Sequence, residues 1–421
     1  MSGGFKKNLQ YYKFCLYGFF KNLRFFEAFL LLFFLDKGLT YLEIGLLYTI
    51  REVVKAVMEI PSGIIADAFG RRKVLISSFF FYIISFLGFS FSGNFILFAF
   101  SMSFFSLGDA FRTGVHKAMI FNYLKVNNWA DQKVDYYGHT RSWSQAGSAI
   151  SAAIAALIVF ITGAYNTIFL LAIIPYLIDA VLIWSYPKFL DGEKTKLDKS
   201  KLIMAFKEVF SGLKLSMKKP ALLKPLISLS LYTGYYKSVK DYVQPIIKTL
   251  AISTPFFAYL NNEKKTAVII GIFYFIAYIL TSIASKNAYG FNKLFSNPSK
   301  AMKISILIGF MSGVIIGLAF IEQYYLASVI GFVIILMVEN IRKPIGISMV
   351  ADNTKDKAMA TILSVESQTK SLFAAVIAPV LGFIADFYSP GISILTVSGL
   401  LIIISIFVRP KNKKNTQPQI N

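Results

Sequence analysis

The chain contains long apolar stretches that recur too often for the core helices of a soluble protein. Two examples are Phe95 to Phe105 and Ile304 to Ile316. Of the 421 residues, 56% are hydrophobic and only 16% are charged, whereas a soluble domain carries about 25% charged residues. Because about 20 mostly apolar residues cross the hydrocarbon layer of a bilayer, these stretches predict a polytopic membrane protein.

Polar residues, glycines and prolines divide the apolar sequence into twelve stretches of spanning length. Helices are expected near residues 12–35, 41–65, 74–93, 95–122, 138–163, 167–187, 221–250, 265–286, 301–320, 323–350, 357–385 and 389–408. The expected fold class is therefore an all-α membrane protein with twelve transmembrane helices.

The formal net charge of +22 is distributed as membrane topology requires, so nucleic acid is not an expected partner. Lys and Arg collect at the N-terminus and at residues 71–73, 188–219, 286–303 and 411–414, whereas the alternate loops hold only Lys37, Lys264 and Lys265. Cytoplasmic loops carry the excess of Lys and Arg in membrane proteins. The pattern predicts a multi-pass protein of the plasma (inner) membrane with both termini in the cytoplasm.

The longest polar segment, residues 187–220, separates the twelve stretches into two sets of six. Within it, apolar residues recur at helical spacing among lysines: Leu202, Phe206, Val209, Phe210 and Leu213. This spacing indicates either an amphipathic helix on the inner membrane surface or a solvated linker helix. The expected domains are an N-terminal six-helix bundle (1–190), a cytoplasmic linker (191–220), a C-terminal six-helix bundle (221–410) and a polar tail (411–421).

The two sets of six resemble each other in sequence. Four segments match in the same order and at similar offsets: 18–24 with 234–240, 67–73 with 287–293, 109–112 with 339–342, and 144–148 with 367–371. Any one of these matches could arise by chance, but four in sequential order indicate a duplication. The two bundles are therefore expected to be pseudo-symmetric.

A short motif lies between the second and third predicted spans. It reads Gly63-Ile64-Ile65-Ala66-Asp67-Ala68-Phe69-Gly70-Arg71-Arg72-Lys73, with the pattern G-x-x-x-D-x-x-G-R-[RK]-[RK]. Gly63 is expected to allow close approach of helices, and Gly70 to permit a tight turn. Asp67 is placed to accept charge-assisted hydrogen bonds from Arg71.

This motif resembles the loop that joins the second and third membrane helices in the major facilitator superfamily (MFS). The resemblance implies the MFS fold, with two pseudo-symmetric six-helix bundles and a substrate site between them near the membrane midplane. It also implies a gating role, rather than a substrate-binding role, for Gly63, Asp67, Gly70, Arg71 and Arg72. The second copy has Asn287, Phe291 and Asn292 in place of the acid and both arginines, so the gating is expected to be asymmetric.

Ionisable side chains inside the predicted spans mark the candidate site, because each costs about 2.5 to 3.5 kcal/mol to insert into a membrane. The candidates for substrate binding or proton coupling are Arg24, Glu27, Asp109, Arg112, Arg141, Lys237, Lys240, Asp241, Glu339 and Arg342. In the MFS fold the first, fourth, seventh and tenth helices line the cavity, and most of these candidates lie there. The structural alternative is that Asp109 with Arg112, and Glu339 with Arg342, only neutralise each other.

The leading hypothesis for function is a secondary active transporter that works by alternating access. Bases outnumber acids among the charges within the spans, and guanidinium groups bind carboxylate or phosphate in a bidentate manner. A small anionic organic solute is therefore favoured, with Arg112 and Arg342 clamping it from opposite sides. Glu27, Asp109 and Glu339 are the candidates for carrying a coupled proton.

Three alternatives stay open. A drug or metabolite exporter is disfavoured, because drug antiporters of the superfamily show G-x-x-x-G-P-x-x-G-G in the fifth helix and residues 147–153 contain no proline. A membrane-embedded enzyme lacks a nucleophile–base set, and a sensor on a transporter fold is the third option. With only Cys15, His116 and His139 as soft ligands, no metal and no cofactor are expected. The expected partners are the lipid bilayer, the solute and protons, and the chain is expected to act as a monomer.

The charge pattern generates a test of topology. Single cysteines at Asn94, Asn166 and Asn261 should react with a membrane-impermeant reagent in intact cells, because the alternate loops that carry them are predicted to face outward. A cysteine at Asn415 should not react until the cells are opened. Labelling of Asn415 in intact cells would show that the predicted topology is wrong.

Overall fold

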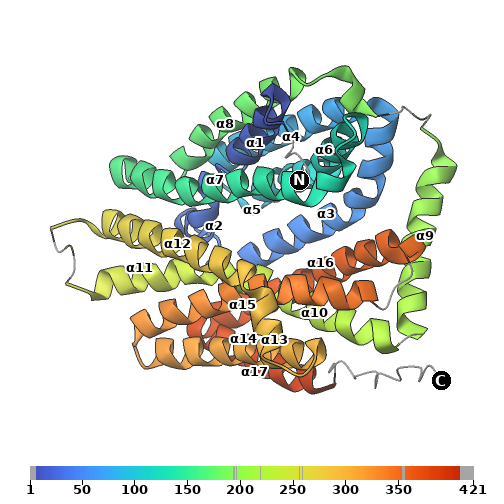
Figure 1. The fold of residues 1–421 in the computed structure, drawn as a ribbon. Coiled ribbons are helices and arrows are strands. Elements are labelled where there is room, and N and C mark those ends of the chain that lie inside the picture. The colour runs from blue at the N-terminus through green and yellow to red at the C-terminus, as the bar shows by residue number, and fades with distance from the viewer. Residues whose placement is uncertain are drawn as a thin grey trace, which may run out of the picture.

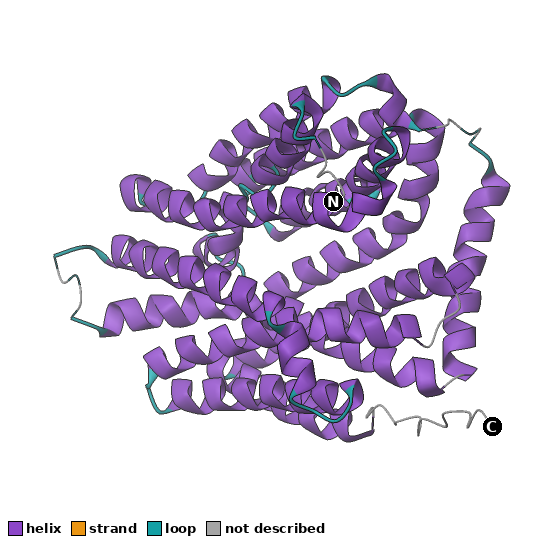
Figure 2. Ribbon diagram, in the orientation of Figure 1, coloured by secondary structure: helices purple, strands orange, loops and turns teal. Residues whose placement is uncertain are grey.

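In the computed structural model of the chain, the described residues are 6–407 apart from 193, 194, 196, 219, 256, 258 and 353–355. All regular structure in this part of the chain is helical, and it contains no strands (Figure 2). The expectation of an all-α protein is thereby confirmed.

The helices fall into two groups by position in the sequence. The N-group comprises α1 (Leu9–Phe20), η1 (Phe25–Ala28), α2 (Leu30–Asp36), α3 (Tyr41–Phe69), α4 (Arg71–Phe91), α5 (Phe95–Arg112), α6 (Val115–Val126), η2 (Ala130–Gln132), α7 (Lys133–Thr162) and α8 (Thr167–Trp184). The C-group comprises α10 (Pro220–Val239), η4 (Lys240–Tyr242), α11 (Val243–Ser253), α12 (Asn262–Lys286), α13 (Ala288–Lys293), α14 (Pro298–Ile321), α15 (Tyr325–Asp352), α16 (Asp356–Phe387) and α17 (Pro390–Phe407).

The two groups are connected through η3 (Lys188–Asp191) and α9 (Lys199–Lys218). Figure 1 shows the N-group in the upper part of the molecule, the C-group in the lower part, and α9 along the right edge between them. We call the end of the bundle that carries Arg71, Lys117 and α9 the basic end, and the end that carries Asp36 and Asn261 the opposite end. The limits of the four domains stay a prediction.

Three of the predicted spans are broken helices. The first is divided into α1 and α2, the fourth into α5 and α6, and the seventh into α10 and α11. At the second of these breaks Gly114 has a φ of +79°, a conformation that only glycine adopts without strain. Beside it, the Thr113 hydroxyl donates to the Asp109 carbonyl (2.7 Å), which lies in the last turn of α5.

Eight helical segments of the described part are long and apolar enough to cross a membrane: Arg71–Phe91, Phe95–Val126, Asp135–Thr162, Thr167–Trp184, Asn262–Lys286, Pro298–Ile321, Tyr325–Val350 and Thr361–Phe387. The first and seventh predicted spans are shortened by their breaks, and the apolar segment Pro390–Ile406 of α17 is shorter than these eight. In α3, ionisable residues such as Arg51, Glu52 and Lys55 interrupt the apolar sequence. The count of twelve spans therefore stays a prediction.

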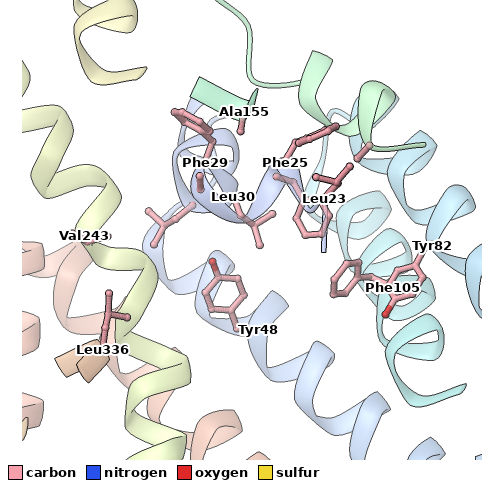
Figure 3. Close-up of a cluster of buried hydrophobic side chains, with 14 of the residues drawn as sticks. Leu23, Phe25, Phe29, Leu30, Tyr48, Tyr82, Phe105, Ala155, Val243 and Leu336 are labelled. Atoms are coloured by element: carbon pink, nitrogen blue, oxygen red, sulfur yellow. The ribbon is translucent and has the colours of Figure 1, made fainter. Parts of the chain in front are cut away.

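The buried apolar core runs without interruption from one group to the other. Figure 3 shows Phe29 and Leu30 of the first broken span, Tyr48 of α3, and Val243 and Leu336 of the C-group in one region. All five side chains are buried. Lipid is as apolar as these side chains, so helix association within a membrane depends on close van der Waals packing, and this core supplies such packing between the two groups.

A glutamine of the C-group satisfies free backbone groups of the N-group near the opposite end. Gln244 of α11 accepts hydrogen bonds from the backbone N–H groups of Leu31 (2.9 Å) and Leu32 (3.3 Å). Its amide also donates to the carbonyl of Glu27 (3.0 Å). These backbone N–H and C=O groups have no partner within a helix because the first span is broken. The break and the contact between the N-group and the C-group therefore depend on each other.

Helices α3 and α16 approach closely at the opposite end. Asp386 of α16 accepts from the backbone N–H groups of Tyr41 (2.7 Å) and Leu42 (2.8 Å) in the first turn of α3, where a negative charge is favourable. A Cβ added at Gly382 would overlap the carbonyl of Tyr41, and one added at Gly45 would overlap the backbone of α16. The glycines thus allow the contact between the two groups.

The replacement Gly382→Ala should lower the melting temperature of the purified protein, because the added methyl group overlaps backbone and overpacking costs about 1 to 3 kcal/mol. Gly399→Ala in α17 is the matched control, since a Cβ there meets open space and alanine favours the helix by about 1 kcal/mol. Melting followed by intrinsic fluorescence in detergent measures both. Equal melting temperatures would contradict the close approach of α3 to α16.

Candidate functional site

A cavity of about 530 Å³ lies at the basic end, mainly within the N-group. It is lined by Phe14, Tyr17, Gly18, Lys21, Asn22, Arg112, Thr113, Gly114, His116, Lys117, Ile120, Tyr137, Thr140, Arg141, Ser144, Gln145, Ser148 and Lys343. Five of these residues are Lys or Arg, and none is Asp or Glu. Lys117, Arg141 and Lys343 are exposed, whereas Lys21 and Arg112 are partly buried. The cavity therefore opens to the surface of the protein at the basic end.

The helix breaks shape this cavity. Helix α1 ends at Phe20, and the next two residues, Lys21 and Asn22, turn into the cavity wall. The Asn22 amide donates to the Ser144 carbonyl of α7 (2.8 Å), which fixes this turn. The break at Gly114 ends α5 at Arg112, so the last side chain of that helix reaches the cavity.

A second cavity of about 520 Å³ adjoins the first and extends its positive surface. It shares Lys117, Tyr137 and Arg141 with the first cavity and adds Lys133. The Lys117 ammonium lies 5.4 Å from the centre of the Tyr137 ring, a cation–π contact that holds it in place. Cationic side chains thus extend from the rim of the first cavity to the surface.

Four of the predicted candidates meet in one network behind the cavity. Asp109 accepts from Arg112 (2.9 Å), from Arg24 (3.3 Å) and from the Tyr82 hydroxyl. Arg24 also pairs with Glu27 (3.0 Å). The two acids and two bases balance in charge, and of the four candidates only Arg112 reaches the cavity.

The matching pair of the C-group is not formed. Arg342 is fully buried and donates to the backbone carbonyls of Met302 (2.8 Å) and Ser228 (2.9 Å). Glu339 accepts instead from the Thr233 hydroxyl (3.0 Å), and no ion pair joins it to Arg342 in the described residues. The expectation that these two residues neutralise each other in the same way as Asp109 and Arg112 is wrong for this conformation, because Arg342 turns toward carbonyls of α10 and α14.

Arg112 and Arg342 consequently do not face each other across the cavity. Arg112 lines it, whereas the buried Arg342 does not. The C-group contributes Lys343, the next residue along α15. The expected clamp of two arginines is therefore absent from this conformation.

Two further candidates, Lys237 and Asp241, join the two groups near the middle of α3, and a third, Lys240, pairs with Asp241. Lys237 of α10 pairs with Glu52 of α3 (2.5 Å). Asp241 accepts from the Tyr48 hydroxyl (3.0 Å) and pairs with Lys240 (2.6 Å). Glu52 and Asp241 are buried, so these bonds lie inside the protein and compensate charges that the core could not otherwise hold.

The predicted gating motif forms a compact turn at the basic end. Gly70 has a φ of +98°, as the expected tight turn requires. Arg71 lies 3.5 Å from Asp67, whose side chain is half exposed. Arg72 donates three hydrogen bonds to Asp191, from its backbone N–H (3.0 Å), Nε (3.1 Å) and Nη2 (2.9 Å). The motif is thus anchored to the segment that follows α8.

One expectation for the motif is not met. Gly63 was expected to allow close approach of another helix, but a Cβ built there meets no other atom of the described residues within 4 Å. The close contacts of α3 lie at Gly45 instead, near the other end of the helix. Gly63 therefore has no packing role in this conformation.

Three acids that the structure singles out were not among the predicted site residues. Asp191 follows a span within a polar segment, where no pattern distinguishes it from its neighbours. Glu52 lies among several charged residues of α3, where only its partner Lys237 singles it out. Asp179 is the only ionisable carboxylate or base between Thr167 and Trp184, so a search for charges within spans could have found it. It is fully buried, and neither carboxylate oxygen has a hydrogen-bond partner in the described part of the chain.

Comparison with known proteins agrees with this architecture. The family model of the Major Facilitator Superfamily matches residues 14–367. The uncharacterized MFS-type transporter YxaM of Bacillus subtilis (strain 168) is 22% identical over 400 residues, which cover 93% of each chain.

Solved structures with the same fold include two kinds of transporter. The nucleoside transporter NupG superimposes with a TM-score of 0.72 at 13% identity, covering 96% of this chain and 98% of that one. A POT family transporter in complex with a thioalcohol conjugated peptide gives a TM-score of 0.70 at 15% identity, covering 94% of both chains. The chain belongs to the major facilitator superfamily and is a membrane transporter of that kind.

Proposed function

We propose that this transporter binds a small anionic organic solute in the cavity at the basic end and moves it by alternating access. The observation that carries the proposal is the lining of the cavity, which brings together five Lys and Arg side chains and no carboxylate. Guanidinium groups bind carboxylate or phosphate in a bidentate manner, and ammonium groups add point charges. Ser144, Gln145 and Asn22 supply the neutral hydrogen-bonding groups that orient a ligand.

Most of this positive charge forms no ion pair within the described part of the chain. Lys21, Lys117, Arg141 and Lys343 form no ion pair with any other described residue, whereas Arg112 is paired with Asp109. A partly buried cation without a partner favours binding of an anion over a neutral or cationic solute. Arg141 is exposed at the rim of the cavity, and Lys21 is partly buried inside it. An anion that enters the cavity therefore meets positive charge at both depths.

Alternating access is supported by the difference between the two ends. At the opposite end, Gln244, Asp386 and the glycine contacts of α3 with α16 join the groups tightly. At the basic end the cavity is open, and the Asp67 side chain pairs only with Arg71 of its own loop among described residues. Asp67 is thus available for a contact with the C-group when that end closes.

For proton coupling we propose Asp179 before Asp109, one of the three carboxylates that the sequence analysis named. A proton on Asp109 would break its bonds with Arg24 and Arg112. A proton on Asp179 breaks no hydrogen bond, since its carboxylate has none in the described residues. Lys21, which lines the cavity, interacts electrostatically with Asp179. Binding of an anion at Lys21 would therefore change the electrostatic potential at this carboxylate.

Uptake into liposomes tests the proposed function directly. The purified protein is reconstituted with an imposed pH gradient and offered radiolabelled mono- and dicarboxylates, sugar phosphates and neutral nucleosides in parallel. Saturable uptake of an organic anion, inhibited by other anions, is expected. Saturable uptake of nucleosides alone would contradict the anionic solute, and no uptake of any solute in either direction would contradict transport of these classes.

The cavity cations should set the affinity for the transported anion. Lys21→Gln should raise KM by roughly tenfold or more, because it removes an unpaired charge from a partly buried site. Arg112→Lys should also raise KM, because the planar fork is lost while the charge stays. Lys300→Gln, which removes an exposed charge of α14 outside the cavity, is the matched control. If Lys21→Gln and Arg112→Lys both keep the original KM, as the control does, the cavity is not the binding site.

The motif should control movement rather than binding. Asp67→Ala should reduce the rate of uptake by roughly tenfold, a barrier change of about 1.4 kcal/mol, while the affinity for the anion stays the same. Asp131→Ala in η2, an exposed acid in another loop of the basic end, is the control. Equilibrium binding and uptake are measured on the same preparations. A loss of binding with normal turnover would contradict the gating role.

A further inference from the structure

An apolar groove of about 390 Å³ runs along the surface between α3, α9 and α16. It is lined by Glu52, Val53, Ala56, Val57, Ile60, Phe206, Val209, Phe210, Leu213, Val365, Gln368, Thr369, Ser371, Leu372 and Ala375. None of these residues lines the cationic cavity. The groove is therefore a separate feature of the molecule.

The groove is elongated along the helix axes. Its residues on α3 run from Glu52 to Ile60, about 12 Å at the helical rise, and those on α16 run from Val365 to Ala375, about 15 Å. Val57 and other apolar side chains of its walls are exposed. Since α16 carries one of the apolar segments of spanning length, we place the groove at the level of the hydrocarbon layer, where the extent of its apolar lining suits part of an acyl chain.

Helix α9 closes the groove at the basic end. Figure 1 shows α9 crossing the ends of α3 and α16. It presents Phe206, Val209, Phe210 and Leu213 to the groove, and a Cβ at its Gly212 would overlap the side chain of Thr361 on α16. The helix is thus seated directly on the C-group, with its apolar face toward the groove.

The charged side chains of α9 indicate the charge of the ligand that the groove would bind. Lys207 and Lys214 each follow a groove-lining residue by one position, are seven residues apart on the same side of the helix, and are exposed. Glu208 is the only acid in α9. A basic helix of this kind attracts anionic lipid headgroups at the membrane surface.

We propose that this groove is a binding site for an anionic phospholipid, with one acyl chain between α3 and α16 and the phosphate headgroup at Lys207 and Lys214. The elongated apolar shape selects the chain, and the two lysines select the negative headgroup over a zwitterionic one. At the deep end of the groove, Glu52 of the N-group accepts from the Ser371 hydroxyl of the C-group (2.8 Å). A lipid in the groove therefore contacts both groups where they are bonded to each other.

Fluorescence quenching by brominated lipids tests the site without a transported solute, so the result does not depend on the proposed function. Trp129, Trp143 and Trp184 are replaced by Phe, and Phe210→Trp places a reporter in the groove. The protein is reconstituted in phosphatidylcholine vesicles that contain a small fraction of brominated phosphatidylglycerol or brominated phosphatidylcholine. Stronger quenching by the brominated phosphatidylglycerol is expected, by roughly fivefold in apparent affinity for each lysine that contacts the headgroup.

Two controls make the result specific. Ile174→Trp in α8, an exposed apolar position far from α9 in the sequence, should report equal quenching by both lipids. In the reporter protein, Lys207→Gln with Lys214→Gln should abolish the preference for phosphatidylglycerol, whereas Lys300→Gln with Lys303→Gln, on α14, should leave it. Equal quenching of the groove reporter by both lipids, as for ordinary boundary lipid, or by neither, as for a groove filled by another protein chain, would overturn the proposal.

Discussion

Water is absent from the hydrocarbon layer, so every charge and every free backbone group of a spanning helix needs a partner within the protein. The breaks in the first, fourth and seventh predicted spans depend on such partners. Gln244 satisfies the backbone at the first break, and Thr113 bonds to a carbonyl at the second. Groups without a partner in the described part of the chain then stand out as functional candidates: the four cavity cations other than Arg112, which form no ion pair there, and the carboxylate of Asp179.

The same constraint explains the difference between the two ends. At the opposite end, backbone groups of one half are satisfied by side chains of the other, as Asp386 does for the first turn of α3. Separation of the halves there would break these hydrogen bonds. At the basic end the motif satisfies its own charges through Asp191 and Asp67. That end can therefore open with no loss of these partners.

Apolar periodicity was enough to predict the helices, because burial in lipid demands long apolar stretches and their ends coincide with polar residues. It did not predict the breaks, such as the change to a 3₁₀ turn at Phe25 to Ala28, where Glu27 interrupts the apolar sequence. Repeat matching located Arg342 on the same helix position as Arg112 but could not predict its partners. Those are carbonyls of α10 and α14, which a sequence pattern does not reveal.

The two halves use equivalent positions in different ways, and this has a consequence for the proposed transport. In the N-group the acid and base pair, and the base stays at the cavity surface. In the C-group, Arg342 donates hydrogen bonds to backbone carbonyls, and of the described C-group residues only Lys343 lines the cavity. A bound anion is therefore held mainly by one half. In the proposed transport, its attraction for Lys343 would draw the second half toward the first, and α9, seated on the C-group, would move with it.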